Sequence, residues 1–396
     1  MSRAASEPPE GGPRAVVADR VFDGSGWHDH AAVLIDEGRV RAIAAAGELP
    51  AGVTPRRLPQ GAILAPGFID LQVNGGGGIL LNDDPSPAAM RAIAEAHRRF
   101  GTTGCLPTLI TDSRERMQAA IAAARTAAGQ DGILGIHLEG PFISPARPGV
   151  HRPDLIARAE AADLERLADL AGAGRSLVTL APECVPDGFV AGLASAGIRV
   201  SAGHSEASAA TMLAAIDEGL TGVTHLYNAM PPLMARDPGI VGAALADRRL
   251  TAGLICDGLH VDPVSVRAAF AAKGADAIAL VTDAMPTVGA TISEFMLMGR
   301  PVRLRNGRLT TADGTLAGAH LDMAAAVRNA VRQAGIGLAD ALTAATRTPA
   351  RFLGLDDERG VLRPGARADM VGLDADLEPV ATWIGGRERP ASGSRP

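Results

Sequence analysis

Between residues 63 and 284 the chain alternates apolar, strand-like runs with alanine-rich stretches of helical periodicity, such as 87–101 and 262–274. Eight strand-like runs can be counted, at 63–73, 102–109, 132–140, 176–183, 198–204, 222–228, 250–258 and 277–284. Eight consecutive βα units predict an α/β fold whose strands close into a (β/α)8 TIM-type barrel, with catalytic groups at their carboxyl ends. A doubly wound sheet is the alternative, but no glycine-rich dinucleotide fingerprint follows the first run.

The two ends of the chain have a different pattern, with short alternating runs separated by turns. We therefore expect residues 1–62 and 356–396 to form one small β-sandwich domain beside a barrel at 63–355. Segments 1–13 and 388–396 are expected to be disordered, because they are polar and rich in proline, glycine and serine. After residue 283 a glycine-rich insertion at about 287–320 is expected to hold a hairpin.

Composition narrows the classes of function. With 47% hydrophobic residues the chain can bury a large core. A net charge of -6 and only 3% aromatic residues count against a nucleic-acid partner. No apolar run is long enough to cross a membrane, and the N-terminal segment lacks the apolar core of a signal peptide. Cys105, Cys184 and Cys256 lie far apart, so we expect free thiols and a reducing, cytoplasmic location.

Polar residues gather at the ends of several predicted strands. Glu139 follows the third run, His204 the fifth and His225 the sixth. An isolated carboxylate at a strand end is more often a helix cap or an ion-pair partner, but convergence on one barrel mouth favours a functional site. One carboxylate and two imidazoles can hold a metal ion and leave a coordination position open for water. Asp283, at the end of the eighth run, lies at the same mouth and can act as a general base.

Several segments together resemble one enzyme family, and the resemblance covers most of the chain. They are PGFIDLQVNGGGG, HLEGPF, SAGHSEA, THLYNAM, PGIVG, DGLH, LVTDAM and RPGARADMV, in that order. This set is similar to the N-acetylglucosamine-6-phosphate deacetylases of the amidohydrolase superfamily. The resemblance implies a metal-dependent barrel with a small β-sandwich, a homodimer, and hydrolysis of the acetamide of a phosphorylated amino sugar.

The first strand departs from a pattern common in that superfamily. Many amidohydrolases carry His-x-His there and bridge two metals with a modified lysine, whereas this chain has Gln72 and Asn74. Neutral amides are poor ligands for Zn²⁺, and Lys273, the only lysine, lies at a predicted helix end. We therefore expect one divalent ion per chain, Zn²⁺ or another divalent transition metal. Gln72, Asn74 and His137 are then candidates for a vestigial metal position or for contacts to the ligands.

Further roles follow from the resemblance. Asp283 would take a proton from water and return one to the departing amine. His151 would help stabilise the oxyanion, although its proline-rich loop is equally typical of a surface histidine. Phosphate would be recognised by the backbone of Asn228 and Ala229 and by the side chains of Arg236 and His260.

The function expected is hydrolysis of N-acetyl-D-glucosamine 6-phosphate to D-glucosamine 6-phosphate and acetate, in amino-sugar catabolism or cell-wall sugar recycling. A second hypothesis is an amidohydrolase acting on a cyclic amide, a dipeptide or an acylated amino acid, against which Arg236 and His260 count. A third is a catalytically dead barrel that serves as an assembly subunit, against which the intact ligand set and Asp283 count. The sequence leaves open the glucosamine or galactosamine configuration, and whether Arg236 and His260 act in their own site or across a dimer.

Overall fold

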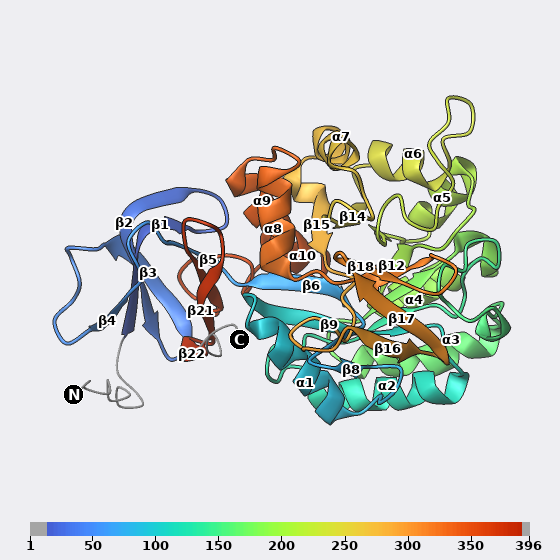
Figure 1. The fold of residues 1–396 in the computed structure, drawn as a ribbon, viewed down its shortest axis with the longest axis horizontal. Coiled ribbons are helices and arrows are strands. Elements are labelled where there is room, and N and C mark those ends of the chain that lie inside the picture. Colours follow the sequence, from blue (N-terminus) through green and yellow to red (C-terminus); the bar gives the residue numbers. More distant parts are fainter. Residues whose placement is uncertain (1–13, 390–396) are drawn as a thin grey trace.

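The computed structural model describes residues 14–389, which form a barrel and a small β domain at its side (Figure 1). The expected disorder of residues 1–13 therefore lies outside the described residues. The small domain is an eight-stranded sheet in the order β22-β21-β20-β5-β1-β2-β3, with β4 paired to β1. Its strands are β1 (Arg14–Phe22), β2 (Trp27–Asp36), β3 (Arg39–Ala45), β4 (Thr54–Arg57), β5 (Ile63–Pro66), β20 (Met370–Leu373), β21 (Pro379–Ile384) and β22 (Arg387–Arg389). Since β5 pairs with both β1 and β20, the two ends of the chain complete one domain.

The barrel consists of eight parallel strands in chain order, as expected. They are β6 (Phe68–Val73), β9 (Thr102–Ile110), β10 (His137–Glu139), β11 (Leu177–Leu180), β12 (Arg199–Ala202), β13 (Gly222–Val223), β14 (Thr251–Ile255) and β15 (Ile278–Val281). A bridge between Val73 and Ala284 joins the last strand to the first. Side chains on both faces of these strands are almost all buried, which explains why they appear in the sequence as continuous apolar runs.

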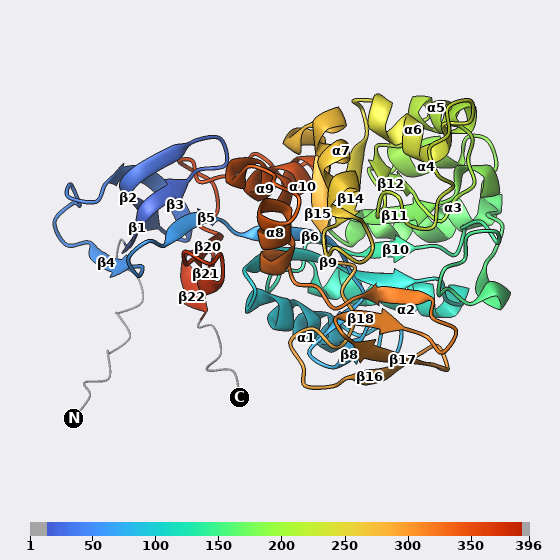
Figure 2. The same cartoon turned by 45° about the horizontal axis from the view of Figure 1, so that its top comes forward.

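Helices cover the outside of the barrel in both views (Figures 1 and 2). They are α1 (Pro87–Arg98), α2 (Arg114–Ala127), α3 (Ala161–Leu167), α4 (Phe189–Ser195), α5 (Ala209–Asp217), α6 (Gly239–Ala246), α7 (Pro263–Lys273), α8 (Met323–Arg332), α9 (Leu338–Ala345) and α10 (Arg347–Phe352). Five of them begin after a side chain that accepts a hydrogen bond from the first turn: Ser86, Ser113, Ser208, Asp262 and Asp322. No helix within residues 14–389 has both the length and the apolar character needed to cross a membrane.

The insertion after the last barrel strand is larger than the expected hairpin. It forms a four-stranded antiparallel sheet of β16 (Glu294–Leu297), β17 (Arg300–Arg305), β18 (Arg308–Thr310) and β19 (Leu316–Ala319). Its apolar residues Leu297, Val302 and Leu309 pack with Ile110 at the end of β9. The insertion therefore lies over the carboxyl ends of the barrel strands, with its strands in orange and brown in Figure 2.

Two local expectations were wrong. The run 63–73 was expected to be one barrel strand, but Gly67 divides it, and 63–66 belongs to the small-domain sheet. A Cβ at Gly67 would lie 2.2 Å from the Thr103 side chain, so only glycine lets the chain pass so close to β9. At the other end, Glu388 and Arg389 pair with β21 in β22, where disorder was expected. The remainder of that expected segment, 390–396, lies outside the described residues.

Candidate active site

Three predicted metal ligands meet at the carboxyl ends of β10, β12 and β13. Oε1 of Glu139 lies 2.9 Å from Nε2 of His225 and 3.2 Å from Nε2 of His204. The two Nε2 atoms are 3.0 Å apart. All three residues are buried, and both histidines have positive φ angles, 48° for His204 and 34° for His225. Such angles are uncommon outside glycine and recur where a surrounding fold fixes a functional side chain.

The protonation of His204 shows what this cluster can hold. Its Nδ1 lies 2.8 Å from the carbonyl oxygen of Arg147, and a carbonyl can only accept. In the neutral ring Nε2 is therefore an unprotonated acceptor, directed at the carboxylate of Glu139 and at Nε2 of His225. Acceptors converging at about 3 Å need a cation between them, and ligands of a tetrahedral Zn²⁺ lie roughly 3.3 Å apart for bonds near 2.05 Å. The cluster thus fits a divalent metal ion.

Electrostatics within the cluster agree with a metal site. Burial favours the neutral form of Glu139, but the imidazoles of His204 and His225 beside its carboxylate hold the pKa of that carboxyl well below the usual range. Burial also works against a charge on His225, whose pKa is nevertheless raised by the adjacent negative charge of Glu139. The site is therefore organised around an ionised Glu139. Lys273, which ends α7, donates instead to the carbonyl oxygens of Ala244 and Asp247, so the single lysine has no part in this cluster.

Asp283 joins this cluster through the amides of Gln72 in β6 and of Asn74 just after that strand. Gln72 donates through Nε2 to Oε2 of Glu139 and to Oδ1 of Asp283, each at 3.1 Å. Asn74 donates to the same Oδ1 at 2.6 Å. Burial, followed by the negative charge of Glu139, raises the pKa of Asp283 to about 6. A carboxylate with such a pKa can exchange a proton near neutral pH.

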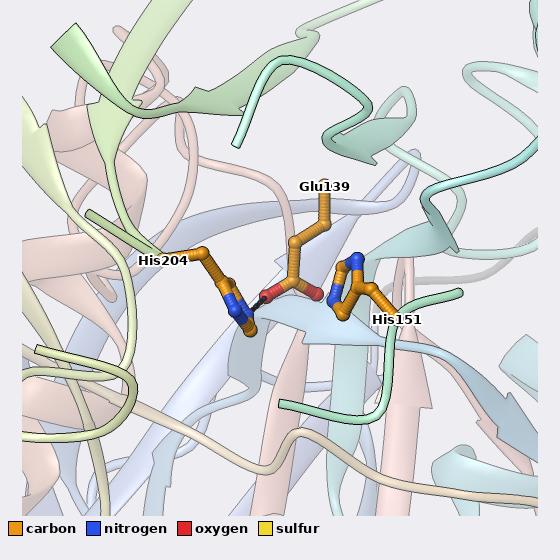
Figure 3. Close-up of side chains that lie close together, drawn as sticks. All are labelled: Glu139, His151 and His204. Atoms are coloured by element: carbon orange, nitrogen blue, oxygen red, sulfur yellow. Dashed lines mark hydrogen bonds and ion pairs between the residues drawn. The ribbon is translucent and has the colours of Figure 1, made fainter. Parts of the chain in front are cut away.

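His151 lies on the opposite side of Glu139 from His204 (Figure 3). Its ring centroid is 4.3 Å from that of His204, and its ligand atoms group with those of Glu139 and His204 within 4.8 Å. The backbone N–H of Thr111 donates to its Nδ1 at 3.4 Å, and burial lowers the pKa of the ring to about 3. In this neutral ring the proton is on Nε2, so His151 is a hydrogen-bond donor to the site, and His225 is the better third ligand.

These residues open into a cavity of about 400 Å³. Its lining brings together most of the predicted site residues: Asn74, Glu139, His151, His204, His225, Asn228, Ala229, His260 and Asp283. His260 is fixed by Asp257, whose Oδ2 lies 2.7 Å from its Nδ1. Arg236 is exposed on the segment after β13 and is not among the described residues that line this cavity.

Sequence reasoning did not find all of the site. The insertion contributes Thr315, Leu316 and Gly318 to the lining, although its role could not be foreseen. The carbonyl of Arg147 and the backbone of Thr111 orient two histidines, and nothing in the residue types signals such contacts. His137 contacts hydroxyl groups inside the barrel, 2.7 Å from Thr179 Oγ1 and 3.4 Å from Thr108 Oγ1. Burial lowers its pKa to about 4, so it is a neutral interior residue.

Residues 63–389 match the model of the amidohydrolase family. The chain belongs to this family. An N-acetylgalactosamine-6-phosphate deacetylase of Shewanella sp. (strain ANA-3) is 42% identical to this amidohydrolase over 364 residues, covering 90% of this chain and 91% of that protein.

Two further relatives extend the match. An N-acetylglucosamine-6-phosphate deacetylase of Haemophilus influenzae is 34% identical over 361 residues, covering 90% of this amidohydrolase and 94% of that protein. The crystal structure of N-acetylglucosamine-6-phosphate deacetylase from Pasteurella multocida superposes with a TM-score of 0.91 at 34% identity, covering 96% of this chain and 100% of that one. The family suggested by the sequence motifs and the fold expected for it are both confirmed.

Proposed function

We propose that this amidohydrolase converts N-acetyl-D-glucosamine 6-phosphate and water into D-glucosamine 6-phosphate and acetate, in amino-sugar catabolism or cell-wall sugar recycling. The observation that carries the proposal is the Asp283 carboxylate, linked through Gln72 to the Glu139–His204–His225 cluster at one cavity. A metal cluster beside a carboxylate with a raised pKa suits hydrolysis of an unactivated amide. The names of the relatives support the substrate class.

Glu139, His204 and His225 would hold one divalent ion per chain, with Zn²⁺ as the expected metal. Such an ion polarises a carbonyl group and lowers the pKa of water. A single ion is favoured because Gln72 at the end of β6 and Asn74 just beyond it present amides to the site, and both donate through nitrogen to Asp283.

Asp283 then moves the proton of the reaction. Both amides donate to its Oδ1, which leaves Oδ2 to accept a proton from the attacking water. The water oxygen forms a bond to the acetyl carbon, the C–N bond breaks, and Asp283 returns the proton to the departing nitrogen. His151, with its proton on Nε2, would donate a hydrogen bond to the oxyanion that develops on the carbonyl.

Phosphate recognition is proposed for Arg236 and His260 together with the backbone of Asn228 and Ala229. The segment around Arg236 also exposes Leu233 by 53% and Met234 by 59%. Adjacent exposed apolar side chains are typical of interfaces, which supports a homodimer. The free thiols of Cys105, Cys184 and Cys256 support the reducing compartment of the cytoplasm.

The galactosamine epimer is a second candidate substrate. One relative named for N-acetylgalactosamine 6-phosphate is 42% identical to this chain, against 34% for the Haemophilus relative named for the glucosamine compound. The two sugars differ only in the configuration of one hydroxyl group, so the same residues can hydrolyse the acetamide of both.

The test is a steady-state assay of acetate release from both N-acetylhexosamine 6-phosphates and from unphosphorylated N-acetylglucosamine, with elemental analysis of the same preparation. We expect the phosphorylated sugars to have the higher kcat/KM, and about one divalent ion per chain. A preference for the free sugar, or no release from any of the three, would overturn the proposed function. Two ions per chain, both required, would overturn the single-metal site.

A further inference from the structure

The barrel closes between β6 and β15 without a continuous ladder. An isolated bridge pairs Val73 of β6 with Ala284, three residues beyond β15. Below it the gap is spanned by the side chain of Asp70, which has no exposed surface. Its Oδ2 accepts a hydrogen bond from Oγ1 of Thr282 at 2.5 Å, and its Oδ1 accepts one from the backbone N–H of Thr282 at 3.2 Å. Its Oδ1 also accepts a hydrogen bond from the backbone N–H of Gln72 at 3.2 Å. The buried carboxylate thus has two of its three hydrogen bonds with one residue, Thr282, which directly follows β15.

That residue immediately precedes Asp283, whose backbone is in the left-handed region with φ = 51°. The N–H of Asp283 donates to the carbonyl of Gln72 at 3.0 Å, and its own carbonyl accepts from Ala319 of the insertion at 2.8 Å. A non-glycine residue stays in this region only when the surrounding contacts fix it. The hydrogen bonds between Asp70 and Thr282 add a restraint directly before Asp283, the residue with the left-handed backbone.

Burying a carboxylate to close a barrel is costly, because the group must give up its hydration. Burial raises the pKa of Asp70 to about 7. The neighbouring seam between β14 and β15 is a regular parallel ladder from Ala252 to Ile255. Pairing of neighbouring barrel strands therefore does not need a carboxylate. Asp70 instead contacts Thr282, the residue that precedes Asp283.

We propose that Asp70 is a positioning residue for the hydrolysis: acting through Thr282, it holds the Asp283 carboxylate in reach of the Gln72 and Asn74 amides. Asp70 is not among the described residues that line the cavity, and its hydrogen bonds are to Thr282 and to the backbone N–H of Gln72. The inference rests on the proposed function, in which Asp283 moves the proton.

Three substitutions test this chain of contacts. Thr282→Val keeps the shape of the side chain and removes the hydroxyl, Thr282→Ser keeps the hydroxyl, and Asp70→Asn removes the charge. We expect Thr282→Val and Asp70→Asn to lower kcat about tenfold to a hundredfold, the scale of a small misplacement of a catalytic group. KM and metal content should stay near the parent values, and Thr282→Ser should restore most of kcat. Because both substitutions disturb the same contact between Asp70 and Thr282, the double variant should be little worse than either single variant.

A matched control is Thr348→Val on α10. Thr348 is also buried, and its Oγ1 donates to the carbonyl of Ala275 at 2.7 Å. This variant should lower the melting temperature without changing kcat. A crystal structure of Thr282→Val should show the Asp283 carboxylate displaced from Nδ2 of Asn74, which it contacts at 2.6 Å in the parent.

The inference is overturned if Thr282→Val keeps the kcat of the parent, or if it loses activity only in proportion to lost metal or lost folded protein. It is also overturned if Thr282→Ser is as impaired as Thr282→Val. A parent enzyme that releases no acetate would instead overturn the proposed function, so the two failures are distinguishable.

Discussion

The two sides of the cavity are built differently. On the strand side, Glu139 and His204 are buried and Asp283 is half-buried at the ends of barrel strands, and each is oriented by at least one further hydrogen bond. On the loop side, His260 is anchored by Asp257, but Arg236 is exposed on an irregular segment between β13 and α6. The chemistry is thus carried by the rigid scaffold, whereas recognition of the far end of the substrate depends on loop residues.

This contrast has a physical reason. Proton transfer and metal binding need fixed distances, which buried strand ends supply at the cost of strained backbone at His204, His225 and Asp283. A phosphate group carries its charge on several oxygens and tolerates a longer, adjustable side chain. The strand side should therefore respond to substitution with large losses in kcat, and the loop side with smaller changes in KM.

The largest effect is expected for the metal ligands. His225→Ala removes one of three ligands, and metal and activity should be lost together, with kcat/KM falling by on the order of 10³-fold or more. Elemental analysis and acetate release, measured on the same preparation, check this. A His225→Ala protein that retains its metal and most of its activity would place the third ligand elsewhere, with His151 as the next candidate.

Asp283→Asn is expected to have the next largest effect. The amide has nearly the same shape but cannot accept the proton, so kcat should fall on the order of 10²-fold or more while substrate still binds. Binding is measured by calorimetry with N-acetylglucosamine 6-phosphate. Near-normal turnover would show that another group moves the proton.

The strand side was also the more predictable one. Glu139, His204, His225 and Asp283 could be identified because each follows an apolar run, and the carboxyl ends of barrel strands share one mouth. The contacts of Gln72 and Asn74 could not, since an amide in place of a histidine indicates only a missing ligand. Which oxygen or nitrogen it meets depends on the closure between β6 and β15, and this closure includes Asp70, a strand-end carboxylate whose partner the sequence does not indicate.

Two predictions about the fold were wrong for similar reasons. Residues 63–73 are apolar throughout, so pattern alone could not separate a strand of the small domain from a strand of the barrel. The division of this run at Gly67 follows from the close packing of Gly67 against Thr103, which only the structure shows. In the insertion, Gly299 and Gly307 have positive φ and lie in the turns of two consecutive hairpins, where one hairpin had been expected.

A smaller effect is expected on stability in acid, because the strand side is supported by buried neutral histidines. Burial lowers the pKa of His97 from 6.5 to about 4. Below pH 6.5 the unfolded chain therefore takes up a proton before the folded chain does, and stability is lost as the pH falls from 6.5 toward 4. By linkage, the shift of this one residue lowers the free energy of unfolding by about 2 kcal/mol between pH 7 and pH 5.

His97→Gln removes the titrating group and keeps a donor for the carbonyl of Gly75, which Nε2 of His97 contacts at 2.9 Å. The drop in melting temperature between pH 7 and pH 5 should be smaller in this variant than in the parent. His30→Gln, on the exposed part of β2, serves as the control and should behave as the parent does. An identical acid dependence for all three proteins would contradict the buried-histidine explanation.

The smallest effect is expected on the loop side, at Arg236. Its planar guanidinium suits two hydrogen bonds to phosphate oxygens, and it lies eleven residues beyond His225, far enough along the chain to approach the opposite end of a hexose. Arg236→Ala should raise KM for N-acetylglucosamine 6-phosphate by about tenfold and change kcat little, which is the scale of one charge-assisted contact at an exposed position. The unphosphorylated sugar should be affected much less.

The measurement compares kcat/KM for the two sugars in the parent, in Arg236→Ala and in His260→Ala. Arg41→Ala, which removes an exposed arginine from β3 of the small domain, controls for a general loss of positive charge. Equal losses for both sugars would mean that Arg236 does not bind phosphate. A loss confined to kcat would place it with the catalytic groups of the strand side, and the division between a rigid chemical side and a recognition side would no longer hold.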